Sequence, residues 1–216
     1  MDFQKKESNI KRPFVTISYE VGAWGLSVVE KLCEYLQKIE INNEHVWKVM
    51  DKDLAEKVVE DVGLPKSSLH YLSESTASEI EDSLEYLVGL HPSRFTLVYN
   101  MNRLILRLAE TGYVIIVGRG ANVISSKLTQ GIHVRLTGSM DNRIRYIKEH
   151  FNVGDLEAKK FIIKENRRRT KYFRKYFDRN INDSALYSMV INTDMLSVED
   201  IVRVIGTLVY KNIRPL

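Results

Sequence analysis

The sequence predicts an α/β protein whose parallel β-sheet is covered by helices on both faces. Short apolar runs of strand length alternate with segments of helical periodicity from Phe14 to Leu208, and this alternation is typical of parallel sheets. The run Tyr113–Val117 is apolar at every position, as expected for a strand that is buried on both faces. No internal repeat or low-complexity linker divides the 216 residues, a length that suits one domain.

Each element is predicted from its own local pattern. Runs rich in apolar and β-branched residues predict strands over residues 14–17, 44–50, 113–117, 132–137 and 189–192. Apolar residues three and four positions apart predict helices over residues 26–38, 51–62, 93–111, around 143–147, 155–175 and 197–208. Asp51, Ser93 and Ser197 are expected N-caps, and Gly63 and Gly112 mark helix ends.

The composition is that of an ordinary globular protein, with 44% hydrophobic and 28% charged residues. No apolar run approaches the ~20 residues of a transmembrane helix, and the polar N-terminus lacks the apolar core of a signal peptide. The single Cys33 lies on the apolar side of a predicted helix and is expected to fill the core. We therefore expect a cytoplasmic protein with no membrane contact.

The positive charge is concentrated in one part of the chain. The net charge is only +4, yet Arg143–Arg179 contains thirteen Lys or Arg residues against five Asp or Glu residues. This asymmetry favours a localised anion site over general coating of nucleic acid.

Three candidate clusters follow strands, where ligands of parallel sheets bind. They are Ser18–Ser27, Gly118–Gly120 and the loop after Thr137. The first is a glycine-bearing turn between a strand and a helix, an arrangement in which backbone N–H groups bind phosphate. The alternative is an ordinary strand-to-helix turn.

Arg119 is the strongest single candidate for a residue that binds phosphate. It stands between two glycines directly after a buried strand, and its guanidinium suits bidentate contact with phosphate. The alternative is that it pairs with a carboxylate and fixes the loop. The basic run Arg167–Lys175 has three interpretations: a helical flap over polyphosphate, a solvated helix face, or a nucleic-acid contact in which Tyr172 and Phe173 stack on bases.

Four groups of residues together carry a resemblance to a known family. They are Val15–Ser18 with Gly22–Gly25; Met50–Leu54; Val114–Asn122; and Arg169–Tyr172 followed by Leu186–Tyr187, Val190–Thr193 and Leu196–Ser197. In order and spacing they resemble the cytidylate-kinase-like family of P-loop nucleoside monophosphate kinases. The resemblance extends from Val15 to about Ile205.

The resemblance implies a P-loop NTPase-type three-layer fold, with a five-stranded parallel sheet, helices on both faces and a helical lid. It also implies one kinase-like domain over residues 1–216. The core would comprise residues 13–50 and 112–211, the acceptor-binding helical lobe about 51–111, and the lid about 154–180.

The implied activity is transfer of the γ-phosphoryl group of ATP, with Mg²⁺, to a nucleoside monophosphate or similar small acceptor. The ATP phosphates would bind at Gly22, Ala23, Trp24, Gly25, Leu26 and Ser27, with the Ser27 hydroxyl near Mg²⁺. The acceptor would bind at Asp51, Lys52, Arg119 and Gly120. Transfer depends on positive charge, which the resemblance assigns to Arg119, Arg167, Arg169 and Arg174.

The chain departs from the family pattern at the phosphate turn. Gly25 stands where cytidylate kinases have lysine, Leu26 where they have a hydroxyl, and Trp24 where they have glycine. A non-catalytic nucleotide sensor or scaffold is therefore the main alternative to a phosphotransferase. A nucleic-acid-binding protein is a minor one. Small-molecule nucleotides are the expected partners, and the sequence leaves the oligomeric state open.

Overall fold

The computed structural model describes residues 12–40, 45–51 and 94–213. The predicted helix at 51–62, most of the predicted acceptor-binding lobe and Lys52 lie outside these ranges. Within them, no helix is both long and apolar enough to cross a bilayer.

The described strands form one five-stranded parallel sheet, as predicted. The strands are β1 (Phe14–Tyr19), β2 (Lys48–Met50), β3 (Val114–Val117), β4 (Gly131–Thr137) and β5 (Met189–Asn192), in the order β2-β3-β1-β4-β5. β1 is central and pairs with β3 on one side and β4 on the other. The carboxyl ends of β1 and β3 therefore lie next to each other.

β2 is shorter than the predicted strand at 44–50. The Gln37 side chain accepts a hydrogen bond from the Trp47 N–H and donates to the His45 carbonyl. These backbone groups are bound to a helix, so pairing with β3 begins only at Lys48.

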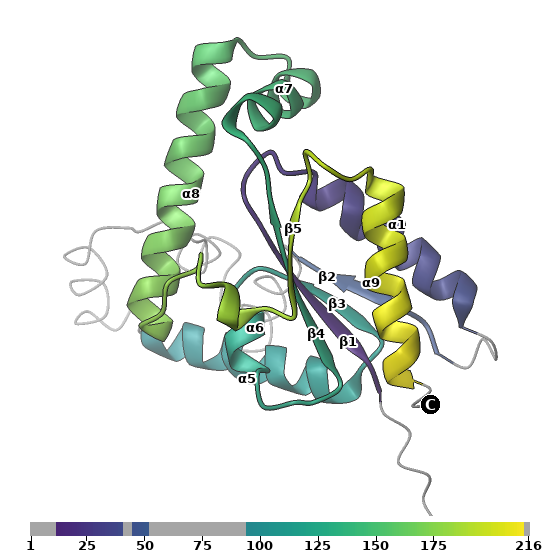
Figure 1. Cartoon of the computed structure of the whole chain (residues 1–216). Coiled ribbons are helices and arrows are strands. Elements are labelled where there is room, and N and C mark those ends of the chain that lie inside the picture. Colours follow the sequence, from purple (N-terminus) through teal and green to yellow (C-terminus); the bar gives the residue numbers. More distant parts are fainter. Residues whose placement is uncertain (1–11, 41–44, 52–93, 214–216) are drawn as a thin grey trace, which may run out of the picture.

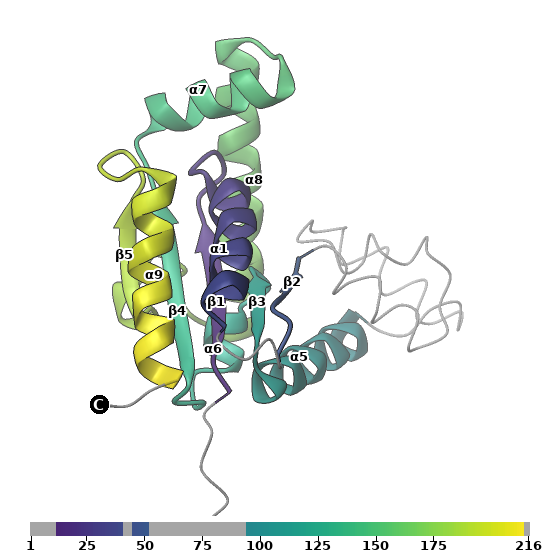
Figure 2. The same ribbon diagram turned by 90° about the vertical axis from the view of Figure 1, so that its right-hand side faces the viewer.

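Helices cover both faces of the sheet (Figures 1 and 2). On one face, α1 (Gly25–Ile39) and α9 (Val198–Ile213) lie side by side, and on the other lie α5 (Arg94–Thr111) and the four-residue α6 (Ala121–Ile124). Alternation along β1 explains this arrangement, because Val15 and Ile17 pack with α1 and α9 while Phe14 packs with α5. α6 was not predicted, since four residues are too few to show helical periodicity, and neither was the short 3-10 helix at Ser184–Leu186.

Two further helices stand at the carboxyl end of the sheet. α7 (Met140–Phe151) leads through Asn152, which has a left-handed backbone conformation, into α8 (Asp155–Phe177). Figure 1 shows α8 extending along one side of the molecule. The two helices share a small core with Val21, which lies in the turn after β1. The predicted lid helix is thus present and is attached to the predicted phosphate turn.

Candidate functional site

The turn after β1 comprises residues 20–25 and is held by backbone hydrogen bonds, one to β4 and one within the turn. The Glu20 N–H donates to the Leu136 carbonyl at 3.0 Å, and the Ala23 N–H donates to the Glu20 carbonyl at 2.9 Å. Gly22 and Trp24 have positive φ values of 87° and 55°. For Trp24 this conformation costs about 1–2 kcal/mol, so the surrounding packing must hold the turn in shape.

The two glycines of the turn allow close approach by the protein itself. A Cβ on Gly22 would lie 2.7 Å from the Arg143 carbonyl oxygen, and a Cβ on Gly25 would overlap the Tyr19 ring. The room that these glycines provide is therefore taken by α7 and by Tyr19.

The Trp24 side chain packs against α7. Its ring centroid lies 4.9 Å from that of Tyr146 and 6.4 Å from that of His150, both in edge-on geometry. The bulk of Trp24 thus joins the turn to α7, and the side chain that lies over the turn is Tyr19.

α8 contacts the same turn through two side chains. The Val21 N–H donates to Asn166 Oδ1 at 3.0 Å. The Arg169 guanidinium donates to the Tyr19 carbonyl at 2.8 Å and lies 4.7 Å from the centroid of the Tyr19 ring. This geometry combines a charge-assisted hydrogen bond with a cation–π contact.

The loop after β3 has an unusual backbone. Gly118, Arg119 and Gly120 have consecutive positive φ values of 68°, 55° and 71°. Glycine adopts this conformation without cost, whereas Arg119 is strained. A Cβ on Gly120 would overlap the Phe177 ring, so the C-terminal end of α8 packs directly on this loop.

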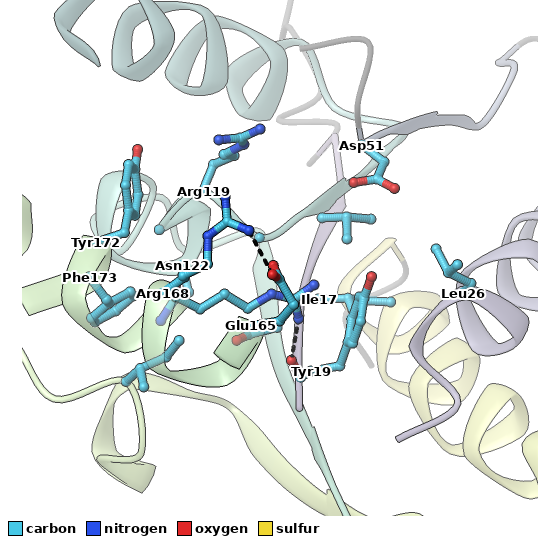
Figure 3. Close-up of a pocket in the computed structure, with 16 residues that line it drawn as sticks. Ile17, Tyr19, Leu26, Asp51, Arg119, Asn122, Glu165, Arg168, Tyr172 and Phe173 are labelled. Carbon is cyan, nitrogen blue, oxygen red and sulfur yellow. Dashed lines mark hydrogen bonds and ion pairs between the residues drawn. The ribbon is translucent and has the colours of Figure 1, made fainter. Parts of the chain in front are cut away.

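A pocket of about 270 Å³ lies between the end of β1, the loop after β3 and α8. Figure 3 shows its lining, with Tyr172 and Phe173 on one side and Leu26 on the opposite side. Its charged lining residues are Arg119, Arg168, Arg169, Asp51 and Glu165. The pocket therefore brings together three arginines and two carboxylates at the carboxyl ends of β1, β2 and β3.

The structure unites only some of the predicted site residues. Arg119, Gly120, Asp51 and Arg169 line the pocket, and of the six turn residues 22–27 only Leu26 does so. Arg167 and Arg174 are exposed and lie outside the lining, and Arg174 pairs with Asp178 at 3.6 Å. Ser27 is half-buried and also lies outside it.

Two charged residues of the pocket were not predicted individually: Glu165, and Arg168, which was included only in the basic run Arg167–Lys175. They form an ion pair at 2.6 Å. With Arg169 and Tyr172 they occupy helix positions i, i+3, i+4 and i+7, which share one face. That spacing could have identified them. Tyr172 and Phe173 are buried, so the nucleic-acid alternative loses the aromatic stacking on which it depended.

Two buried arginines contact β1 and the turn that follows it. Arg143 lies 3.5 Å from Glu20 Oε2, which also accepts a hydrogen bond from the Gly138 N–H. Arg135 donates to Ser18 Oγ at 2.6 Å and to Asn182 Oδ1 at 3.0 Å. Burial lowers the pKa of Arg135, because water no longer stabilises its charge.

The residues at the turn do not fit ATP with its Mg²⁺ ion. The Val21 and Ala23 N–H groups are already bonded within the protein, and the Tyr19 ring covers Gly25. Leu26 supplies no hydroxyl for the metal ion.

Residues 14–195 match the model of the cytidylate kinase-like family. The chain belongs to the cytidylate kinase-like family. This result confirms the resemblance found in the sequence, and the sheet order and covering helices confirm the predicted P-loop kinase type of fold. None of the curated proteins matches the chain at a significant level.

Several solved structures are similar to this chain. An uncharacterized protein from Eubacterium ventriosum is 18% identical with a TM-score of 0.67, over 92% of this chain and 99% of that one. A protein named APE1195 is 16% identical with a TM-score of 0.51, over 95% of this chain and 98% of that one. A shikimate kinase from Bacteroides thetaiotaomicron is 17% identical with a TM-score of 0.49, over 92% and 98%. At such low identity the first two likenesses show the fold alone.

Proposed function

We propose that this kinase-like chain binds a nucleoside monophosphate, or a phosphate ester of similar size, in the pocket beneath α8. The observation that carries this proposal is the convergence of Arg119, Arg168 and Arg169 on one pocket. Guanidinium groups match the geometry of phosphate oxygens and keep their charge at all physiological pH values. Three arginines against the two carboxylates Asp51 and Glu165 leave one positive charge in excess in the lining, which favours an anion.

The other walls suit the remainder of such a ligand. Ile17 and Val117 supply apolar surface, and Tyr172 and Phe173 supply aromatic surface. The volume of about 270 Å³ is close to the lower limit of about 300 Å³ for ligand pockets. A small ligand with one phosphate group therefore fits better than an extended one.

The test is isothermal calorimetry with a panel of nucleoside and deoxynucleoside monophosphates. Arg119→Ala is expected to weaken binding about 10- to 100-fold, because a hydrogen bond to a charged group is worth about 1.5–3 kcal/mol. Arg203→Ala is the matched control, since Arg203 is an exposed, ion-paired arginine on α9.

Circular dichroism must show that the fold of Arg119→Ala is intact. Unchanged affinity in that variant would remove Arg119 from the site. A wild-type chain that bound no member of the panel would contradict the proposed function.

The second candidate function is transfer of a phosphoryl group from ATP to the bound monophosphate. Membership of the cytidylate kinase-like family favours it, whereas the contacts at the turn oppose the binding of ATP there. Arg119 and Arg169 would be the charge stabilisers. A coupled assay of ATP with the same panel separates the two functions. Turnover would establish a phosphotransferase, whereas binding without turnover on any acceptor would support a nucleotide sensor.

A further inference from the structure

A phosphate turn needs available backbone N–H groups, because phosphate oxygens accept hydrogen bonds from them at close range. In this turn, the protein itself uses two of them. The Val21 N–H donates to Asn166 Oδ1 at 3.0 Å, and the Ala23 N–H donates to the Glu20 carbonyl at 2.9 Å. The amide oxygen of Asn166 thus occupies an N–H group at the start of the turn and fixes the turn to α8.

A phosphate turn also needs open space beside its glycines. Here the Tyr19 ring occupies the position of a Cβ on Gly25. Arg169 fixes this ring, since its guanidinium carbon lies 4.7 Å from the ring centroid and it donates to the Tyr19 carbonyl at 2.8 Å. Tyr19 is therefore held by contacts from both α1 and α8.

Tyr19 also lies between the turn and the pocket. Tyr19 and Leu26 line the pocket, whereas Gly22, Ala23, Trp24 and Gly25 do not. A chain of phosphates that extended from the pocket toward the turn would meet Tyr19 and Leu26, both of which line the pocket (Figure 3). A single phosphate beside the arginines would not reach them.

We infer that Tyr19 and Asn166 are specificity-determining residues, which exclude a triphosphate from the turn and restrict the chain to a monophosphate. The identity of the bound ligand rests on the proposed function. The exclusion of the triphosphate rests only on the contacts of Tyr19 and Asn166 and is measured separately.

The experiment compares ATP with Mg²⁺ against the monophosphate panel by calorimetry, in wild type, Tyr19→Ala, Asn166→Ala and the double variant. Wild type is expected to bind ATP at least about 100-fold more weakly than its best monophosphate. Each single variant is expected to bind ATP about tenfold more tightly than wild type, and the double variant more tightly still. Asn166→Ala keeps the test decisive if Tyr19→Ala does not fold.

Two controls separate this effect from general loss of a tyrosine. Tyr99 on α5 is 62% exposed, and Arg103 lies 5.8 Å from its ring centroid. Tyr99→Ala therefore removes a tyrosine–arginine contact far from the turn and should leave ATP affinity at the wild-type value. Tyr19→Phe keeps the ring and should exclude ATP more strongly than Tyr19→Ala does.

Two results would overturn the inference: ATP that binds wild type as tightly as the best monophosphate, or variants whose ATP affinity stays at the wild-type value. If wild type binds no monophosphate, the proposed function fails instead. The ATP affinities of the variants relative to wild type then still decide the inference.

Discussion

At the scale of single residues, β4 carries two ionisable side chains that are largely removed from water. Nδ1 of His133 lies 2.8 Å from Thr16 Oγ1, and Arg135 donates to Ser18 Oγ. Burial lowers the pKa of both residues because it disfavours the charged form. Arg135 stays charged, since its ordinary pKa is far above neutrality, whereas His133 stays neutral.

The lowered pKa of His133 predicts a pH-dependent stability. The unfolded chain takes up this proton near its ordinary pKa of about 6.5, and the folded chain does so only at lower pH. Between these values the unfolded state binds more protons, so the free energy of unfolding falls as the pH falls. Urea unfolding from about pH 7.5 to about pH 5.5 should show a smaller loss for His133→Gln than for wild type. Equal losses would contradict the prediction.

The glycines show how far single residues could be interpreted from the sequence. Gly22, Gly25 and Gly120 lie in the two loops that were predicted to bind a ligand, and a side chain at any of them would collide with a neighbouring group. The approaching groups are Arg143, Tyr19 and Phe177, although the sequence suggested a phosphate. The absence of a side chain indicates tight packing but does not identify the group that fills the space.

At the scale of elements, α8 has two charged faces with different surroundings. Glu165, Arg168 and Arg169 face the pocket, while Arg167 and Lys171 are exposed. The sequence identified the helix and its basic charge, because both are local properties. Helical spacing could also have separated the two faces. Which of the two lines the pocket can be determined only once the position of the pocket in the fold is known.

The two faces of α8 predict unequal effects for substitutions of two neighbouring arginines. Arg168→Ala should weaken monophosphate binding about tenfold, because Arg168 lines the pocket beside Glu165 and its contact is charge-assisted. Arg167→Ala, one residue away, should change affinity less than about twofold, as is usual for an exposed charge. Calorimetry with the best monophosphate measures both. Equal losses in the two variants would contradict the assigned orientation of α8.

At the scale of the whole molecule, the alternating pattern was enough to predict the five-stranded parallel sheet and its two covering layers. The pattern also predicted that Arg119 lies at the ligand-binding edge of the sheet, because the carboxyl ends of parallel strands meet there. The contact between Val21 and Asn166 could not be predicted from the sequence, since 145 positions separate the two residues. No local pattern specifies which distant side chain reaches a turn.

The pocket is assembled from segments far apart in the chain, including β1, the loop at Gly118–Gly120 and α8. Only the folded molecule can therefore bind the monophosphate, and binding must stabilise the whole fold. A monophosphate at about 100 times its dissociation constant should stabilise the fold by about 2.7 kcal/mol. For a chain of this size, the melting temperature should rise by roughly 5–10 °C.

Differential scanning fluorimetry of wild type and Arg119→Ala at the same ligand concentration measures this shift. The variant should show a smaller rise, because it binds less ligand at that concentration. The unliganded melting temperatures of the two proteins correct for any direct effect of the substitution on stability. An equal ligand-induced rise in both would mean that the ligand stabilises the fold from a site other than the pocket beneath α8.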